Sequence, residues 1–294
     1  MSGKLLKLTL ALLLLFVCSF YAKTAVAQTT FEQSVNRKLD SLLAANGTLS
    51  LRKQFELYPN DAMNGIMTPS GWGGYGTAVF GAIGGTYPEQ YRDNKADLIA
   101  SGGVCFGNPQ KAVNFAASLN MTDVHHFRNF SGNFIVSRMI FTGSSISAGA
   151  LQAFASKKYS DASNPTFFFA FSHAVQWANS TTPGVSALSY TLGIGNGRFL
   201  DKSPDDVKAG KGKHGTAVFG SVSYEILRHV NLNGEWYGEN LGFSLTMRPF
   251  SNPLSFGIGA ANLTGYSGDR KTMVFTVGYP LSLTNLKNRD KQQQ

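Results

Sequence analysis

VNLNGEWY, residues 230–237, and LGFSLTM, residues 241–247, alternate apolar and polar side chains along their length. The same alternation returns in MVFTVGY, residues 273–279. A period of two is typical of a β-strand with one face in an apolar medium and the other against polar or tightly packed groups. The apolar face predicted from these stretches comprises Leu232, Trp236, Phe243, Leu245, Phe275 and Tyr279.

The N-terminus carries the pattern of an export signal. Two lysines precede an apolar run from Leu8 to Phe20, and Ala25-Val26-Ala27 is a small-residue cleavage site. The apolar run is shorter than the roughly 20 residues that a permanent transmembrane helix needs. We therefore predict a signal peptide over residues 1–27. An exported chain with repeated strands of this kind is a candidate for a bacterial outer-membrane barrel.

Composition narrows the class of protein. Charged residues make up 15% of the chain, whereas Gly (32) and Phe (22) are plentiful, which suits a barrel whose outer surface faces lipid. The formal charge of +9 is moderately basic, but no aromatic-interleaved basic stripe is present, so we expect no nucleic-acid partner. Basic loops suit membrane lipids and lipopolysaccharide instead. After cleavage Cys105 is the one cysteine left, which precludes an internal disulfide and predicts a small buried side chain.

An all-β fold follows, an antiparallel transmembrane β-barrel of about twelve strands over residues 71–282. Most predicted strands approach the ~9–11 residues that a tilted strand needs to cross the hydrocarbon. The predicted strands are 75–83, 96–106, 112–121, 132–141, 146–155, 165–176, 185–194, 215–226, 230–237, 240–247, 254–263 and 272–280.

The segments flanking the barrel receive separate predictions. Residues 28–70 are predicted to be a periplasmic helical extension and linker, because apolar residues recur at spacings of three and four over 28–58. That helix either lies against the domain or plugs the barrel mouth, and it offers a surface to an envelope protein partner. Residues 59–74, rich in Pro, Asn and Gly, read as a linker or a tight entry, and residues 283–294 as a periplasmic tail.

Connection lengths give an independent indication of orientation. Outer-membrane barrels have short periplasmic turns and longer outer loops. If the first strand runs outward, the odd-numbered connections are extracellular, and most are longer than their even-numbered neighbours. The longest, about 195–214, is highly charged, whereas a tight turn near Gly238-Glu239 departs from the trend.

The inward face is where a channel would carry its function. A tight hairpin near residues 227–229 would place Glu225 opposite Asn231, and Glu235 with Arg248 would contribute charge to a constriction. Alternatively, these side chains fill a closed interior, because twelve strands form a narrow barrel. The lumen and constriction candidates are Asn114, Asn120, Glu225, Asn231, Asn233, Glu235 and Arg248.

Catalytic and metal chemistry have weaker signals. Ser172 directly precedes His173, but neighbours in a strand point to opposite faces and form no dyad by themselves. Asp123, His125 and His126 share a predicted outer loop, where adjacent histidines are a weak metal signal. We therefore expect no catalytic residue, metal site or cofactor.

Three segments resemble recurring elements of uncharacterised porin-like bacterial outer-membrane β-barrel proteins. They are GNPQKAV (107–113), LGIGNGRF (192–199) and the stretch from Trp236 to Phe250. The resemblance covers most of residues 71–282 and implies a barrel and an outer-membrane location. It carries over no catalytic or ligand-binding residue.

The sequence thus predicts a barrel without enzymatic activity in the cell outer membrane. Its role would be a narrow passive channel or a structural or accessory component of the envelope. Two alternatives stay open, an outer-membrane enzyme that modifies lipid and a soluble exported β-sandwich that binds a glycan or a protein. The lipid enzyme requires a Ser or Asp and a His that converge on one face near the outer leaflet.

Overall fold

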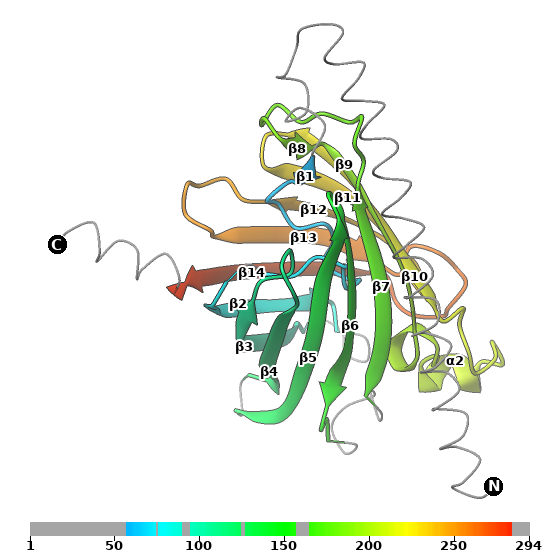
Figure 1. Ribbon diagram of the computed structural model, residues 1–294. Coiled ribbons are helices and arrows are strands. Elements are labelled where there is room, and N and C mark those ends of the chain that lie inside the picture. Colours follow the sequence, from blue (N-terminus) through cyan, green and yellow to red (C-terminus); the bar gives the residue numbers. More distant parts are fainter. Residues whose placement is uncertain (1–56, 75, 90–94, 125–126, 157–164, 284–294) are drawn as a thin grey trace, which may run out of the picture. The chain divides into compact units, whose positions relative to one another are not determined.

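The computed structural model describes residues 57–74, 76–89, 95–124, 127–156 and 165–283 (Figure 1). The predicted signal peptide, the predicted helix up to residue 56, His125, His126 and the tail from residue 284 lie outside these residues. None of the described residues belongs to a helix that is long and apolar enough to span a membrane.

Twelve antiparallel strands close into one barrel, which confirms the all-β fold and the strand number predicted from the sequence. Each predicted strand overlaps an observed one. The wall strands are β2 (Ala78–Tyr87), β3 (Asp97–Gly107), β4 (Asn114–Asp123), β5 (Arg128–Phe141), β6 (Ser144–Ala153), β7 (Thr166–Ala174), β9 (Leu188–Gly195), β10 (Val218–Leu227), β11 (Val230–Tyr237), β12 (Leu241–Met247), β13 (Ser255–Ala261) and β14 (Thr272–Ser282).

Each wall strand pairs with the next one along the chain, and the first and last strands complete the ring. β14 pairs with β2 from Met273↔Tyr87 to Ser282↔Ala78. A closed ring satisfies the backbone hydrogen bonds of every wall strand between neighbours, as a span through hydrocarbon requires. Apart from the wall, β1 (Tyr58–Pro59) and β8 (Val185–Ser186) form a two-stranded parallel pair.

The two ends of the barrel differ in their connections. The short-turn end holds residues 108–113, 142–143, 175–187, 228–229 and 248–254. The long-loop end holds, among the described residues, 88–89, 95–96, 124, 127, 154–156, 165, 196–217, 238–240 and 262–271. The longest loop, 196–217, carries η2 (Gly197–Phe199) and α2 (Pro204–Lys208). In Figure 1, β1 and β8 mark the short-turn end and α2 marks the long-loop end.

Alternating side chains divide the wall into an apolar outside and a polar inside. Val222, Leu232 and Phe243 point outward and remain about half exposed. Small polar side chains and a glutamate point inward and are buried. They include Ser221, Ser223, Asn231, Asn233, Glu235, Ser244 and Thr246. This distribution is that of an outer-membrane-type barrel, and the β-sandwich alternative is wrong because the strands close into a single ring.

An aromatic cluster fills part of the interior toward the long-loop end. Phe199, from η2, stacks on Phe219 with ring centroids 4.3 Å apart, and both side chains are fully buried. Phe168 packs against the same cluster, whereas its neighbours Phe167 and Phe169 are exposed on the outside. The register of β7 therefore assigns the faces of a phenylalanine run that is too apolar to show a period in the sequence.

We expect Val222→Arg to destabilise the folded barrel in lipid by about 2–4 kcal/mol, because the arginine would place a charge in the middle of the outward apolar face. Val222 is 54% exposed and lies at mid-strand in β10. Urea titration in lipid vesicles, followed by heat-modifiable gel mobility, measures the difference. Val222→Leu is the control and should match the unmodified chain. Equal stability of the arginine variant would contradict a lipid-facing surface there.

Candidate functional site: the occluded lumen

Residues 57–74, here called the plug loop, run inside the barrel. The loop enters at the short-turn end, where the Leu57 N–H donates to Gln176 Oε1 at 2.9 Å. It reaches its greatest depth near Thr68 and returns to the short-turn end before β2 begins at Ala78. The sequence analysis assigned residues 28–70 to a periplasmic helical extension and linker and read residues 59–74 as a linker or a tight entry; in the structure residues 57–74 lie inside the barrel.

The deep turn of the plug loop is held by one carboxylate. Glu235, on β11, is fully buried and accepts the backbone N–H of Ile66 at 2.9 Å through Oε1. Its Oε2 accepts the N–H of Met67 and both the N–H and the hydroxyl of Thr68, each at 2.9 Å. Hydrogen bonds to an ionised acceptor are stronger than neutral ones, so this carboxylate clamp is the strongest single attachment of the loop.

The carboxylate clamp demands glycine at the preceding position. Gly65 has φ of +141°, a backbone conformation that L side chains rarely adopt. A Cβ on this residue would lie 2.5 Å from Oε2 of Glu235. Backbone and carboxylate therefore approach more closely than any side chain at 65 would permit.

A network of amides and hydroxyls holds the entering limb. Asn231 and Asn60 exchange two side-chain hydrogen bonds, at 2.8 and 2.9 Å. The Thr246 hydroxyl donates to the Met63 carbonyl at 2.5 Å, and the Ser189 hydroxyl donates to Asn64 Oδ1 at 3.1 Å. Three wall strands thereby satisfy polar groups that the loop would otherwise bury unpaired.

The returning limb lies against β6 and β7, the second of which adjoins β9 in the ring. The Ser147 hydroxyl donates to the Ser70 carbonyl, and the Gly71 N–H donates to the Ser172 hydroxyl at 2.7 Å. A Cβ on Gly71 would stand 2.5 Å from the carbonyl oxygen of Ser145. Ser172, which precedes His173 in sequence, thus belongs to the wall residues that bond the plug loop, here called its seat.

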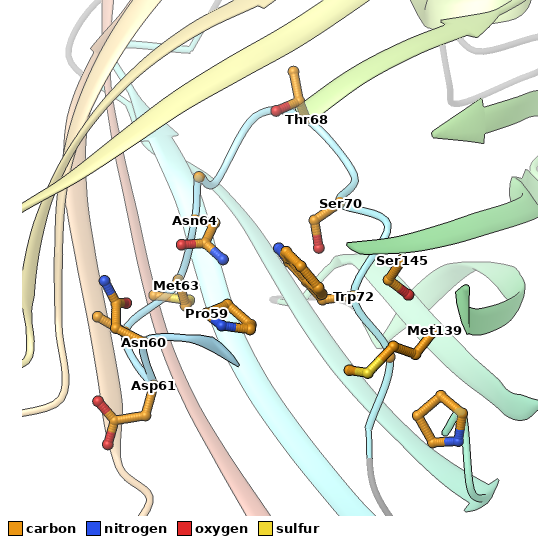
Figure 2. Close-up of a pocket in the computed structure, with 14 residues that line it drawn as sticks. Pro59, Asn60, Asp61, Met63, Asn64, Thr68, Ser70, Trp72, Met139 and Ser145 are labelled. Atoms are coloured by element: carbon orange, nitrogen blue, oxygen red, sulfur yellow. The ribbon is translucent and has the colours of Figure 1, made fainter. Parts of the chain in front are cut away.

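A cavity of about 470 Å³ remains between the plug loop and the wall on the short-turn side. Figure 2 shows residues 59–64 on one side of it and Trp72, Met139 and Ser145 on the other. The indole N–H of Trp72 is buried and has no hydrogen-bond partner among the described residues. The lumen therefore forms a vestibule on this side, lined largely by the plug loop.

All six strand-borne lumen candidates from the sequence lie on inward positions. Asn114 donates to the Phe106 carbonyl, and Asn120 accepts from Ser101 and donates to Ser131. Glu225 pairs in register with Asn231, as predicted, and accepts the His229 N–H at 3.1 Å. These asparagines and this glutamate are engaged by neighbouring wall groups or by the plug loop.

Glu235 and Arg248 do not meet at a common constriction. Arg248 follows the end of β12 and lies at the rim, where its guanidinium is 3.5 Å from Asp61 of the plug loop. His229 Nδ1 lies 2.6 Å from the same aspartate. Asn233 bonds Ser223 and Ser244 within the wall. A constriction role for any of these residues stays a prediction.

The plug loop itself is the part of the site that the sequence analysis missed. Its run of Pro, Asn and Gly between Pro59 and Gly74 has no strand or helix period, and the same composition is typical of an external linker. The available signal was the large number of inward polar positions on the strands. A narrow barrel needs partners for such groups, and a segment close to the first strand is the nearest source.

An outward-facing Ser–His pair lies on the surface of the wall near the short-turn end. Ser144, at the start of β6, is in register with His173 on β7, and its Oγ lies 2.7 Å from His173 Nδ1. The Tyr190 ring lies 5.6 Å from the imidazole. Among the described residues, no third group bonds the imidazole, and Ser144 is only 5% exposed.

No protein-family model matches the chain, and no curated protein sequence matches it. Among solved structures it is similar to outer membrane phospholipase A from Escherichia coli, with a TM-score of 0.38 and 11% identity over 79% of this chain and 96% of that one. The outer membrane phospholipase dimer of Salmonella typhi with bound calcium gives 0.35 and 10% over 69% and 90%. Similarity at this level assigns no activity and no residue role to this chain. The fold assignment rests on the strand pairing of the chain itself.

We expect Glu235→Ala to release the deep turn of the plug loop. Three backbone N–H groups would lose their acceptor, at about 1–3 kcal/mol for each one left unsatisfied. Hydrogen–deuterium exchange of the peptide containing residues 66–68 should therefore accelerate by about tenfold or more.

Glu225→Ala is the matched control for this measurement. Glu225 is also an inward glutamate, on the adjacent strand, but its carboxylate accepts the His229 N–H and bonds no described residue of the plug loop. Exchange at residues 66–68 should stay unchanged in this variant. Equal exchange in both variants would show that Glu235 does not hold the loop.

Proposed function

We propose that this protein is a closed, non-enzymatic outer-membrane barrel that acts as a structural or accessory component of the envelope. The observation that carries the proposal is the carboxylate clamp of Glu235 on Ile66, Met67 and Thr68. A passive pore needs a water-filled path, and the middle of this lumen is occupied by the chain's own backbone.

Side chains at the long-loop end support the same proposal. Met67 of the plug loop packs with Ala261 and Val274 of the wall, and Tyr237 borders this cluster. Tyr237 also borders the aromatic cluster around Phe199. One apolar cluster therefore includes the plug loop, Tyr237 links it to the second, and together they occupy space in which a narrow channel would run.

If the lumen is closed, the outer surface of the barrel and residues 28–58 are where lipids or a partner protein would bind. The apolar belt around the wall suits membrane lipids, and the basic residues of the loops suit lipopolysaccharide. An envelope protein partner that binds through residues 28–58 stays a prediction for a segment mostly outside the described residues. A closed barrel would serve such a partner as an anchor in the membrane.

Conductance in planar bilayers tests the closed state. We expect the purified full-length protein to show no stepwise current at moderate voltage, and Glu235→Ala to open discrete conductances because the plug loop is loosened. Gly71→Val is a second route to the same result, since its side chain cannot seat between β6 and β7. Both variants should first show heat-modifiable mobility, which reports a folded barrel.

Glu225→Ala should stay as silent as the unmodified protein in these recordings. A steady current through the unmodified protein, equal to that of the two loop variants, would instead establish a channel that the plug loop does not close.

A second candidate function is acyl-lipid hydrolysis, favoured by the outward Ser144–His173 pair. A serine hydroxyl hydrogen-bonded to an imidazole is the arrangement of an activated nucleophile, and this one faces the surface that lipid covers. Against it stand the low exposure of Ser144 and the lack, among the described residues, of a third group that orients the imidazole.

Release of fatty acid from phospholipid micelles distinguishes the two functions. For the closed accessory barrel we expect no hydrolysis above background, with or without Ser144→Ala and His173→Ala. Turnover by the unmodified protein that both substitutions abolish, while Ser172→Ala leaves it intact, would establish the hydrolase. Ser172 is the control because it neighbours His173 in sequence but faces the lumen.

A further inference from the structure

Three carboxylates from three separate loops meet at the long-loop end. Asp206 lies on α2, Glu239 lies in the turn 238–240, and Asp269 lies in the loop 262–271. Each offers an oxygen to a group in which all three ligand atoms lie within 4.8 Å of one another. We call these residues the acidic mouth cluster.

The acidic mouth cluster is buried, unlike an ordinary surface patch. Asp206 is 1% exposed and Glu239 is 7% exposed. Asp206 Oδ2 and Glu239 Oε1 have no hydrogen-bond partner among the described residues. Neither residue forms an ion pair with a described residue. A buried carboxylate oxygen without a partner is costly, and such groups are usually explained by a bound ion or a water.

Neighbouring groups hold the cluster in place, and Lys202 and Arg198 act on Glu239 from beyond ion-pair distance. Asp206 Oδ1 accepts the Gly268 N–H, and the Ser267 hydroxyl donates to Asp269 Oδ2 at 2.9 Å. Burial, together with the nearby charges of Asp269 and Asp206 and against the opposing effect of Lys202, raises the pKa of Glu239 to about 7. The three side chains are therefore held together against their mutual repulsion.

Spacing and ligand chemistry select the class of ion. Oxygens on opposite sides of a bound Ca²⁺ lie about 5 Å apart, because each stands about 2.3–2.6 Å from the ion. Ca²⁺ accepts carboxylates in irregular geometry, whereas Mg²⁺ demands a near-ideal octahedron at shorter distances. Carboxylates within 4.8 Å of one another can share one ion, and their irregular arrangement on three loops favours Ca²⁺ over Mg²⁺.

We propose that Asp206, Glu239 and Asp269 bind a divalent cation of the Ca²⁺ class, which ties three loops together across the long-loop end of the barrel. The sequence analysis expected no metal site, because these residues lie far apart in the chain and share no ligand spacing. The ion would offset most of the cluster's negative charge and give the unpartnered oxygens of Asp206 and Glu239 a ligand.

Calorimetric titration of the refolded full-length protein with CaCl₂ at pH 8, in chelator-washed detergent buffer, tests the site. We expect one Ca²⁺ per chain, weaker binding of Mg²⁺, and at least a tenfold loss of Ca²⁺ affinity in both Asp206→Asn and Glu239→Gln. Asp205→Asn is the matched control, because Asp205 neighbours Asp206 on α2 but is exposed and pairs with Lys208. Its affinity should be unchanged.

Thermal unfolding supplies a readout that a merely structural role would not produce. With chelator present, Asp206→Asn and Glu239→Gln should unfold at a temperature equal to or higher than the unmodified protein, since each removes a repelling charge. With millimolar CaCl₂, the unmodified protein should gain stability and the two variants should not. Absence of Ca²⁺ binding at millimolar concentration, or an equal loss in Asp205→Asn, would overturn the proposal, whether or not the lumen conducts.

Discussion

The arrangement of the lumen depends on a carboxylate that would be costly to bury alone. Moving a carboxylate out of water costs several kcal/mol unless hydrogen-bond donors replace the solvent. Around Glu235 those donors are the backbone N–H groups of Ile66, Met67 and Thr68, together with two hydroxyls. These N–H groups depend on Glu235 in turn, because the turn of the plug loop has no neighbouring strand whose carbonyl groups could accept their hydrogen bonds. The depth of the loop and the position of the vestibule both follow from this exchange.

Local periodicity explains why the wall was predictable. The faces of β11, β12 and β14 follow from alternation, since each strand reports its own two environments, and the strand number near twelve follows from strand and connection lengths as well. Even the pairing of Glu225 with Asn231 follows, because a tight hairpin sets its register locally. The inward direction of Glu235 was therefore accessible from the sequence, whereas its partners were not.

The contacts that could not be predicted from the sequence join residues far apart in the chain. The plug loop has no period, and its bonds to Glu235 join residues 167 to 169 positions apart. His173 illustrates the same limit. Its sequence neighbour Ser172 faces the lumen, and the serine it contacts is Ser144, reached only through the register of β6 with β7. The acidic mouth cluster likewise gathers residues from three loops that only the closed ring brings together.

The position of the plug loop in the chain has a consequence for assembly. Both limbs of the loop emerge at the short-turn end, so it can seat or withdraw as a hairpin, and neither terminus has to thread through the ring. Its seat is built from β6, β7, β9, β11 and β12, all of which follow it in the chain. The seat is complete only when those strands stand side by side. The segment that leaves the ribosome before any wall strand is therefore among the last to reach its native place, and until then Glu235 faces an interior that still holds water.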